Sequence, residues 1–420
     1  MSNKEESSAV GGGGTALVPK LRFPDFVGQP IQALQVADAT TESTERNGSG
    51  QTAAQIMGVS KVEGIVPMVE RIVAADTARY KFVRKDWFAY NPMRINIGSI
   101  ARWKGEDDIL VSPDYVVFKC KSSGPHRLDP RYLDHFRRSD AWEDFVSEKG
   151  DGSVRVRIYY RDLARLQLAL PFFPEQQKIA DCLDSADALI EAQAQKVEAL
   201  KSHKRGLMQQ LFPRPERVEN GIKMPAETLP RVRFPEFAGA GAWIRKTLNE
   251  TCEIINNRRR PIASSLRAAG PYPYYGASGI VDYIDDFIFD ETLLLIGEDG
   301  AKWGAFEQTA FLARGKYWVN NHAHVLRPVT AVDAFLTNYL IMIDISPHVT
   351  GAAPPKLTLG KLKEIQVPLP PTRHEQQRIA DCLTSLDDRI AAETQKLDTL
   401  KTHKKGLMQQ LFPKVVKGDV

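Results

Sequence analysis

A segment of 39 residues occurs twice in this chain, with the two copies 200 residues apart. Residues 175–213 return as residues 375–413, and 26 of the 39 positions are identical. A repeat of this length indicates one structural unit that the chain uses twice. The sequence between the copies does not repeat, so the chain combines a constant part with two variable parts.

Apolar residues recur within each copy in alternating steps of four and three, which is the heptad pattern of a helix that packs against another helix. Polar residues interrupt the pattern at matching places, Gln193 and Glu393 in one layer and Lys204 and Lys404 in another. Such interruptions cost stability but fix pairing and orientation. We therefore predict that the two copies pair as an antiparallel coiled coil. Its predicted core residues are Ile179, Leu183, Ile190, Val197, Leu200, Leu207, Leu211, Ile379, Leu383, Leu386, Ile390, Leu397, Leu400, Leu407 and Leu411.

The same heptads would also suit two separate segments that each form a coiled coil with another chain. Against this alternative, the copies share residues outside the apolar seam, such as Asp181 and Cys182 with Asp381 and Cys382. These shared positions predict a surface that is presented twice, to two copies of one partner.

Fainter similarities extend the repeat beyond the helices. Residues 19–26 and 230–237 are alike, and Arg157 precedes the first helix at nearly the distance at which Lys356 precedes the second. The chain is therefore predicted to hold two tandem units, each a variable domain followed by a long helix. The predicted segments are a disordered tail (1–18), a first variable domain (19–170), a central helix (171–213), a linker (214–229), a second variable domain (230–369), a C-terminal helix (370–413) and a second tail (414–420).

Composition fits two domains but does not by itself assign a function. The net charge is +4, which permits nucleic-acid binding without indicating it. The four cysteines lack the spacing of a metal or redox site, so they predict reduced thiols in a cytoplasmic protein. No apolar run approaches the roughly 18 residues of a membrane-spanning helix.

Short runs of strand-forming residues, separated by glycine, proline and aspartate, predict an α+β fold for both variable domains. The expected strands are 80–83, 96–100 and 115–121 in the first domain and 293–296, 310–312 and 317–319 in the second, with helices over 131–145 and 333–345.

Each variable domain ends in a proline-containing turn, which leads into a helix that opens EQQ-x-IADCL at residues 175 and 375. Further distinctive phrases stand at residues 80–100, 111–118, 270–285, 294–301 and 316–327. Together, over residues 19–413, these features resemble the specificity subunit of type I restriction-modification systems.

This resemblance implies a function in DNA recognition. In that family each variable domain is a target recognition domain, which reads one half of a bipartite, asymmetric sequence in double-stranded DNA, and the helices hold the halves apart. It also implies two modification (methyltransferase) subunits and restriction (helicase-nuclease) subunits as partners, and no catalytic residue, metal or cofactor in this chain. A helix of about 38 residues is roughly 57 Å long, which would separate two readers by one to two turns of DNA.

Candidate DNA contacts are basic, amide and aromatic side chains in the variable domains. Arginines suit phosphates, and asparagine can bond adenine through two hydrogen bonds. Each set also has a structural interpretation: a solvated loop for the arginines at 258–260, core packing for the tyrosines, and a buried polar network for residues 320–324. The predicted contacts are Lys81, Arg84, Lys85, Tyr90, Asn91, Arg94, Asn96, Arg155, Arg157, Arg258, Arg259, Arg260, Tyr274, Tyr275, Ser278, Asn320, Asn321, His322, His324 and Lys356.

Catalytic motifs are incomplete in this sequence. Residues 91–94 share only the first two residues of the Asn-Pro-Pro-aromatic loop of adenine methyltransferases. Glu298, Asp299 and Lys302 have the wrong spacing for a nuclease cluster, and no phosphate-binding loop is present. The alternative to a DNA reader is therefore a structural adaptor, which would bind partners through its helix pair without reading DNA.

Overall fold

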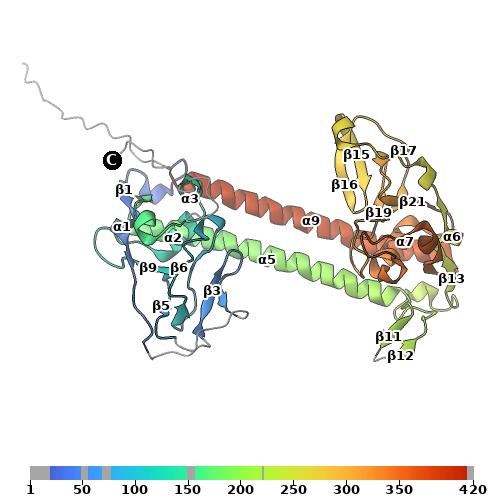
Figure 1. Ribbon diagram of the computed structural model, residues 1–420, viewed down its shortest axis with the longest axis horizontal. Coiled ribbons are helices and arrows are strands. Elements are labelled where there is room, and N and C mark those ends of the chain that lie inside the picture. Colours follow the sequence, from blue (N-terminus) through green and yellow to red (C-terminus); the bar gives the residue numbers. More distant parts are fainter. Residues whose placement is uncertain (1–18, 49–54, 69–76, 149–156, 220–221, 414–420) are drawn as a thin grey trace, which may run out of the picture. The chain divides into compact units, whose positions relative to one another are not determined.

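The computed structural model describes residues 19–48, 55–68, 77–148, 157–219 and 222–413 (Figure 1). The chain divides into two compact units: unit 1 comprises residues 1–192 and 397–420, and unit 2 comprises residues 193–396. The boundary crosses both long helices, α5 (Phe173–Leu211) and α9 (Arg373–Leu411). Each unit therefore contains one variable domain, the first half of the helix that follows it and the last half of the other helix.

Unit 1 is built around a four-stranded antiparallel sheet with the strand order β2-β9-β6-β7. Three further antiparallel pairs, β1–β10, β3–β4 and β5–β8, complete its strands. Its elements are β1 (Gln32–Gln35), α1 (Val36–Ala39), β2 (Thr40–Glu42), β3 (Met57–Ser60), β4 (Gly64–Pro67), β5 (Lys81–Val83), β6 (Phe88–Tyr90), β7 (Ile100–Arg102), β8 (Ile109–Val111), β9 (Val116–Cys120), α2 (Pro130–Phe136), α3 (Asp140–Glu148), α4 (Tyr160–Leu163) and β10 (Gln167–Leu170).

Unit 2 has two four-stranded sheets, β14-β21-β18-β19 and β16-β15-β20-β17, and the pairs β13–β22 and β11–β12. Its elements are β11 (Arg217–Glu219), β12 (Ile222–Met224), β13 (Ile244–Thr247), α6 (Leu248–Thr251), β14 (Cys252–Ile254), β15 (Ala269–Gly276), β16 (Gly279–Ile284), β17 (Phe289–Asp290), β18 (Leu293–Gly297), β19 (Ala310–Ala313), β20 (Lys316–Val319), β21 (Ala323–Pro328), α7 (Asp333–Met342), α8 (Leu359–Glu364) and β22 (Gln366–Leu369).

The two variable domains share one topology, although their sequences do not repeat. The sheet β2-β9-β6-β7 corresponds to β14-β21-β18-β19, and β1–β10 corresponds to β13–β22. The hairpin β3–β4 corresponds to β15–β16, and the antiparallel pair β5–β8 to β17–β20. Even the parallel ladder between β15 and β20 has a counterpart, a single parallel bridge between Ile56 and Leu110. One fold is therefore built twice, and positions in the two units can be matched by strand register.

Backbone hydrogen bonds confirm the faint repeat upstream of the helices. The amide of Ile158 donates to the carbonyl of Pro92 at 3.0 Å, and the amide of Leu357 donates to that of Glu298 at 2.8 Å. Arg157 and Lys356 therefore occupy equivalent places immediately before these bonds.

The helices α5 and α9 pair in antiparallel fashion, as the heptad pattern predicts. In unit 1, Lys404 near the end of α9 pairs with Asp187 in the first half of α5. In unit 2 the roles are exchanged, and the Nζ of Lys204 lies 2.6 Å from Asp387. In the other polar layer, the side-chain Nε2 of Gln193 donates a hydrogen bond to the carboxylate of Glu393 at 2.7 Å. The polar breaks in the heptads are thus specific contacts between the two copies.

The predicted helix-core residues are all at least half-buried, but their burial varies. The residues at the two ends of each helix and the central valine and leucine are buried, whereas the others are half-buried. The buried set is Ile179, Leu183, Val197, Leu211, Ile379, Leu383, Leu397 and Leu411; the half-buried set is Ile190, Leu200, Leu207, Leu386, Ile390, Leu400 and Leu407.

The heptad pattern misses two phenylalanines that close the helices. Phe412, just after α9, packs its ring against Tyr132 and Phe136 of α2 at centroid distances of 5.2 and 5.8 Å. Phe212, just after α5, packs in the same way against Phe335 at 5.0 Å. The helix α5 therefore ends in the core of the variable domain of unit 2, and α9 ends in the core of the variable domain of unit 1. Met208 and Met408 are buried in these two cores as well.

A buried ion pair attaches each variable domain to the start of the helix that follows it. Arg22 donates from Nε and Nη2 to Glu175 at 2.8 and 2.7 Å. Arg233 makes the same two-pronged contact with Glu375 at 2.6 and 2.7 Å. The two carboxylates are almost completely buried. Because an isolated buried charge is costly, these arginines are required partners of the helix starts.

Several elements differ from those expected. The expected strand over 96–100 is wrong, because a 3₁₀ turn (Ile95–Ile97) ends at Gly98 with φ 91°, and β7 begins only at Ile100. The helix expected over 131–145 is two helices, α2 and α3, and the second domain's helix ends at Met342 rather than 345. The hairpin β11–β12 forms within the segment expected to be a linker. The two expected tails lie outside the described residues.

Among the described residues, no helix combines the length and apolar character that a membrane crossing requires.

Candidate nucleic-acid interface

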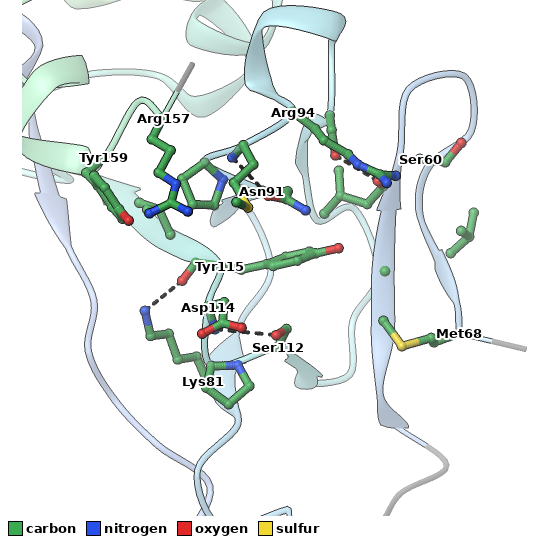
Figure 2. Close-up of a pocket in the computed structure, with 18 of the residues that line it drawn as sticks. Ser60, Met68, Lys81, Asn91, Arg94, Ser112, Asp114, Tyr115, Arg157 and Tyr159 are labelled. Atoms are coloured by element: carbon green, nitrogen blue, oxygen red, sulfur yellow. Dashed lines mark hydrogen bonds between the residues drawn. The ribbon is translucent and has the colours of Figure 1, made fainter. Parts of the chain in front are cut away.

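A cleft of about 1020 Å³ in unit 1 brings together four of the predicted DNA contacts (Figure 2). Lys81, Asn91, Arg94 and Arg157 reach it from β5, from the loop after β6 and from the segment before α4. The hairpin β3–β4 forms another wall, toward which Arg94 extends in Figure 2. Residues from four separate parts of the sequence therefore converge on one surface.

The loop after β6 positions two of these side chains. The side-chain oxygen of Asn91 accepts a hydrogen bond from the amide of Met93 at 3.0 Å, which closes a tight turn. Arg94 then stands at the rim, exposed to solvent. Within the described residues, the guanidinium groups of Arg94 and Arg157 have no hydrogen-bond or ion-pair partner. Both are thus available to a ligand.

The remaining residues of the cleft set its charge and shape. Lys81 donates from Nζ to the carbonyl of Tyr115 at 2.6 Å, and burial lowers the pKa of Lys81. Three basic side chains and two acidic ones, Glu42 and Asp114, line the cleft, which leaves it net positive. The ring of Tyr115 lies across its centre in Figure 2. Free guanidinium groups beside an aromatic face suit phosphates and base edges.

The other predicted contacts of unit 1 have different surroundings. Arg84 is ion-paired with Glu45 at 2.6 Å, and Lys85 with Glu106 at 2.5 Å. Tyr90 is completely buried in the sheet, edge-on to Phe118. Asn96 is exposed on the 3₁₀ turn, and Arg155 lies outside the described residues.

In unit 2, the place that corresponds to the cleft of unit 1 carries acidic residues. Strand register places Gly297, Glu298 and Asp299 where unit 1 has Asn91, Pro92 and Met93. A side chain at Gly297 is excluded, since its Cβ would lie 2.7 Å from the carbonyl oxygen of Ala277. The same fold therefore presents a carboxylate pair in one unit and guanidinium groups in the other.

Four of the predicted contacts surround this carboxylate pair. Arg259 lies 2.7 Å from Glu298, and Lys356 lies 3.3 Å from both carboxylates. His322 bonds Asp299 through Nδ1. Burial would raise the pKa of Glu298, but the hydrogen bonds from Arg259 and Lys356 and the neighbouring positive charge hold it below its usual range. Glu298 is therefore ionised at neutral pH.

The fourth of these residues, His324, is a buried part of the same network. Its Nε2–H donates to the carbonyl of Leu357 at 2.7 Å, and its Nδ1 accepts from the side-chain amide of Asn256 at 2.9 Å. Both ring nitrogens are used in the neutral tautomer, and burial lowers the pKa of His324. His324 thus positions the site rather than facing a ligand.

We expect His324 to make unit 2 less stable in mild acid. Its pKa is depressed in the folded state, so below the ordinary value of 6.5 only the unfolded chain takes up the proton, and stability falls with pH. Replacing His324 with valine, which unit 1 carries as Val116 at the same strand position, should lower stability at neutral pH, because Asn256 and the carbonyl of Leu357 lose a hydrogen-bond partner. It should also flatten the slope between pH 6.5 and 5 by up to about 1.4 kcal/mol per pH unit. Urea unfolding at several pH values measures this slope, and an unchanged slope would contradict the assignment.

The remaining predicted contacts of unit 2 divide into exposed and structural residues. Arg258 is held by the carbonyl of Ile288 at 2.7 Å and by the ring of Phe289 at 4.5 Å. Tyr274 is buried, and its hydroxyl accepts from the amide of Ile262. Asn320 is buried and accepts from the amide of His322. Arg260, Ser278 and Asn321 are exposed, and Tyr275 is half-buried.

The nuclease-like cluster of Glu298, Asp299 and Lys302 does not form in the structure. Lys356, not Lys302, joins Glu298 and Asp299, and Lys302 instead lies 3.8 Å from Glu307. In the described part of the chain, no group of three or more histidine, cysteine, aspartate or glutamate residues could hold a metal ion.

Comparison with known proteins finds sequence similarity to DNA specificity proteins. Residues 241–402 match the family model of the type I restriction modification DNA specificity domain. A Haemophilus influenzae protein named as a type I restriction enzyme specificity subunit is 39% identical over 145 residues, which cover 34% of this chain and 37% of that relative. The MjaX specificity subunit of Methanocaldococcus jannaschii is 22% identical over 365 residues, which cover 82% and 81% of the two chains.

Solved structures share the fold over nearly the whole chain. The crystal structure of the type I restriction-modification S subunit from M. genitalium superposes with a TM-score of 0.57 at 15% identity, and covers 95% of this chain and all of that one. A chain from a study of assembly and conformational transition in a type I system superposes with a TM-score of 0.54 at 17% identity, and covers 93% and 98%. At these identities the likeness establishes the fold alone.

Proposed function

Because the chain belongs to the family of type I restriction-modification specificity subunits, we propose that it selects a split target in double-stranded DNA for partner enzymes. Each unit would read one half of the target. The observation that carries this proposal is the cleft of unit 1, where the unpaired guanidinium groups of Arg94 and Arg157 stand beside Asn91. Arginine can bond guanine or phosphate, and asparagine can bond adenine.

The opposite charges at equivalent positions support a target whose two halves differ. A carboxylate accepts a hydrogen bond from the N4 amino group of cytosine, whereas a guanidinium group donates to guanine. Unit 2 offers Glu298 and Asp299 where unit 1 offers a basic cleft. The two units would therefore prefer different bases, and the target would be asymmetric.

Burial narrows the set of residues that we propose as direct contacts. The buried side chains of Tyr90, Tyr274, Asn320 and His324 would support the sites from within, and Arg259 and Lys356 would hold the carboxylates. The proposed direct contacts are Lys81, Asn91, Arg94, Asn96, Arg157, Arg258, Arg260, Tyr275, Ser278, Asn321 and His322.

Catalysis would come from partners. The repeated faces of α5 and α9 expose His203 and His403 at equivalent positions, as two copies of one partner would require. We propose that two methyltransferase subunits bind these faces and that restriction subunits join them, in the cytoplasm where the DNA lies. The length of the paired helices would then set the number of base pairs between the half-sites.

The test is an exchange of one variable domain in the complex with the cognate modification subunit. We expect the complex to methylate adenine at one split sequence and the chain alone to transfer no methyl group. Replacing residues 230–369 with the corresponding domain of another family member should change one half of the methylated sequence and leave the other half intact. DNA binding by the complex should weaken steeply with salt, because phosphate contacts release counterions.

A methylated sequence that stays the same after the exchange would identify the chain as an adaptor instead. Methyl transfer or cleavage by the chain alone would also contradict the proposal.

A further inference from the structure

Unit 1 has a second cleft, of about 420 Å³, which shares only Ser60 with the first. The turn of the β3–β4 hairpin, β7 with the residues after it, and the end of α2 form its walls. Its basic side chains are Lys61, Arg102, Lys104, Arg137 and Arg138. None of them was among the contacts predicted from the sequence.

Three guanidinium groups of this cleft surround one buried carboxylate. Asp134 lies 2.6 Å from Arg137, 3.6 Å from Arg102 and 3.8 Å from Arg138. The side chains of Arg102 and Arg137 are only 10% and 13% exposed. Two acidic residues outside the lining also pair with these arginines, Asp86 with Arg102 and Asp187 with Arg138. The lining itself has five basic side chains against the two carboxylates of Asp134 and Glu63, so the cleft is net positive.

One buried donor in this cleft makes no hydrogen bond. The Nε–H of Arg102 lies 3.6 Å from the carboxylate of Asp134, which is beyond hydrogen-bonding distance. An unsatisfied buried donor costs about 1–3 kcal/mol, so such a group requires an explanation, and one explanation is a site for a bound ion. Burial lowers the pKa of Arg137, and the adjacent Arg138 and Arg102 lower it further against the pull of Asp134. A bound anion would accept a hydrogen bond from Arg102 and would offset the positive charge around Arg137.

The mouth of the cleft extends this positive field. Lys61 and Lys104 are exposed there, and neither has an ion-pair partner among the residues that the structure describes. The cleft contains one further carboxylate, Glu63, and the indole of Trp103 lines the wall beside Lys104. Two exposed ammonium groups and three guanidinium groups that face Asp134 form a typical arrangement for binding a phosphate.

The shared fold does not require this cluster. Strand register places Leu312 of unit 2 at the position of Arg102. Gln176 and Gln376 accept from the amides of Asp129 and Val332, which aligns α2 with α7 and puts Thr337 at the position of Asp134. The same sheet and helix therefore pack without any of these charges in unit 2. A structural role common to both domains does not explain them.

We propose that this second cleft of unit 1 binds a phosphate group, with Arg102, Arg137 and Arg138 as its base and Lys61 and Lys104 as its rim. The phosphate has two possible sources. It belongs either to the DNA backbone beside the half-site of unit 1 or to a small phosphate-bearing molecule.

The first experiment uses the full chain and inorganic pyrophosphate, at constant ionic strength, in a calorimetric titration. We expect saturable binding to the wild type, a loss of more than about tenfold in affinity in Lys61→Gln/Lys104→Gln, and no binding in Arg102→Leu, which carries the residue of unit 2. The charge-matched control is Lys20→Gln/Lys363→Gln, two exposed lysines outside the cleft, which should bind as the wild type does. Thermal unfolding of each variant separates lost binding from lost folding. Absence of binding to the wild type, or equal binding to Arg102→Leu, would overturn the proposal.

A second experiment identifies the source of the phosphate. With the cognate modification subunit present, the salt dependence of DNA binding is compared between the wild type and Lys61→Gln/Lys104→Gln. A slope that decreases by about 0.9 for each lost phosphate contact, with an unchanged target sequence, assigns the cleft to the DNA backbone. An unchanged slope, together with lost pyrophosphate binding, assigns it to a small molecule. If the wild-type complex binds no specific DNA, the proposed function fails while the pyrophosphate titration still decides the present proposal.

Discussion

Replacing Arg233 with methionine is expected to lower the free energy of unfolding of unit 2 by about 3–5 kcal/mol. Arg233 is the two-pronged partner of Glu375, whose carboxylate is 0% exposed at the start of α9. Without the guanidinium group, a charge remains in the interior with no counterion. Urea unfolding followed by circular dichroism measures the loss.

Two further variants show whether the buried charge is the cause. Replacing both Arg233 and Glu375 with methionine removes the stranded charge and should recover most of the stability. Lys361→Met breaks only an exposed pair with Glu364, 2.8 Å apart, and should cost less than about 0.5 kcal/mol. If Arg233→Met cost no more than Lys361→Met, the proposed importance of the buried pair would be wrong.

The second large effect is expected in DNA binding. Arg94→Ala/Arg157→Ala removes the two unpaired guanidinium groups of the first cleft, and each contact with a base is worth about 1–3 kcal/mol. The complex with the modification subunit should therefore lose about 2–6 kcal/mol of binding to its target. Fluorescence anisotropy with labelled duplex DNA gives this value. Since neither side chain has a partner within the described protein, folding should be unaffected.

A second pair of arginines in unit 1 provides the control for the loss of positive charge alone. Arg161 and Arg165 are exposed near α4 and do not line the cleft. Arg161→Ala/Arg165→Ala should bind almost as well as the wild type. The cleft variant should keep its preference for the half-site of unit 2, tested with duplexes altered in one half only. Equal loss of preference for both halves would be evidence against separate readers.

The helix pair could be predicted from the sequence because it depends on a local period. Apolar side chains three and four residues apart lie on one face of a helix, so Leu183 and Leu383 follow from spacing alone. Phe212 and Phe412 lie past the last heptad, and their partners in α7 and α2 are far away in sequence. Their identical QLFP contexts were the available signal, but the contact itself depends on tertiary packing.

The candidate site was predicted only in part, for two physical reasons. Alternation along a strand does not say which face is the core, so Tyr90 and His324 were expected to face DNA, although both are buried. Nor does the sequence show which charges meet. Arg84 pairs with Glu45, and Arg259 with Glu298, each across about 39 residues of chain. Arg94 and Arg157 were among the predicted contacts, but only the fold shows that they share a cleft and that their guanidinium groups have no partner among the described residues.

The opening segment of each variable domain is joined to the end of the other copy of the helix. The amide of Leu21 donates to the carbonyl of Gln410 at 3.1 Å, just as the amide of Val232 donates to that of Gln210 at 3.0 Å. In the second case a short segment of chain connects the two sites, and in the first they lie near the two ends of the chain. Within each unit, the same hydrogen bond therefore joins the opening segment of the variable domain to the end of a long helix. Because this bond forms whether its two sites are close together or far apart along the chain, the local packing of the helix end, and not the connecting segment, holds the joint.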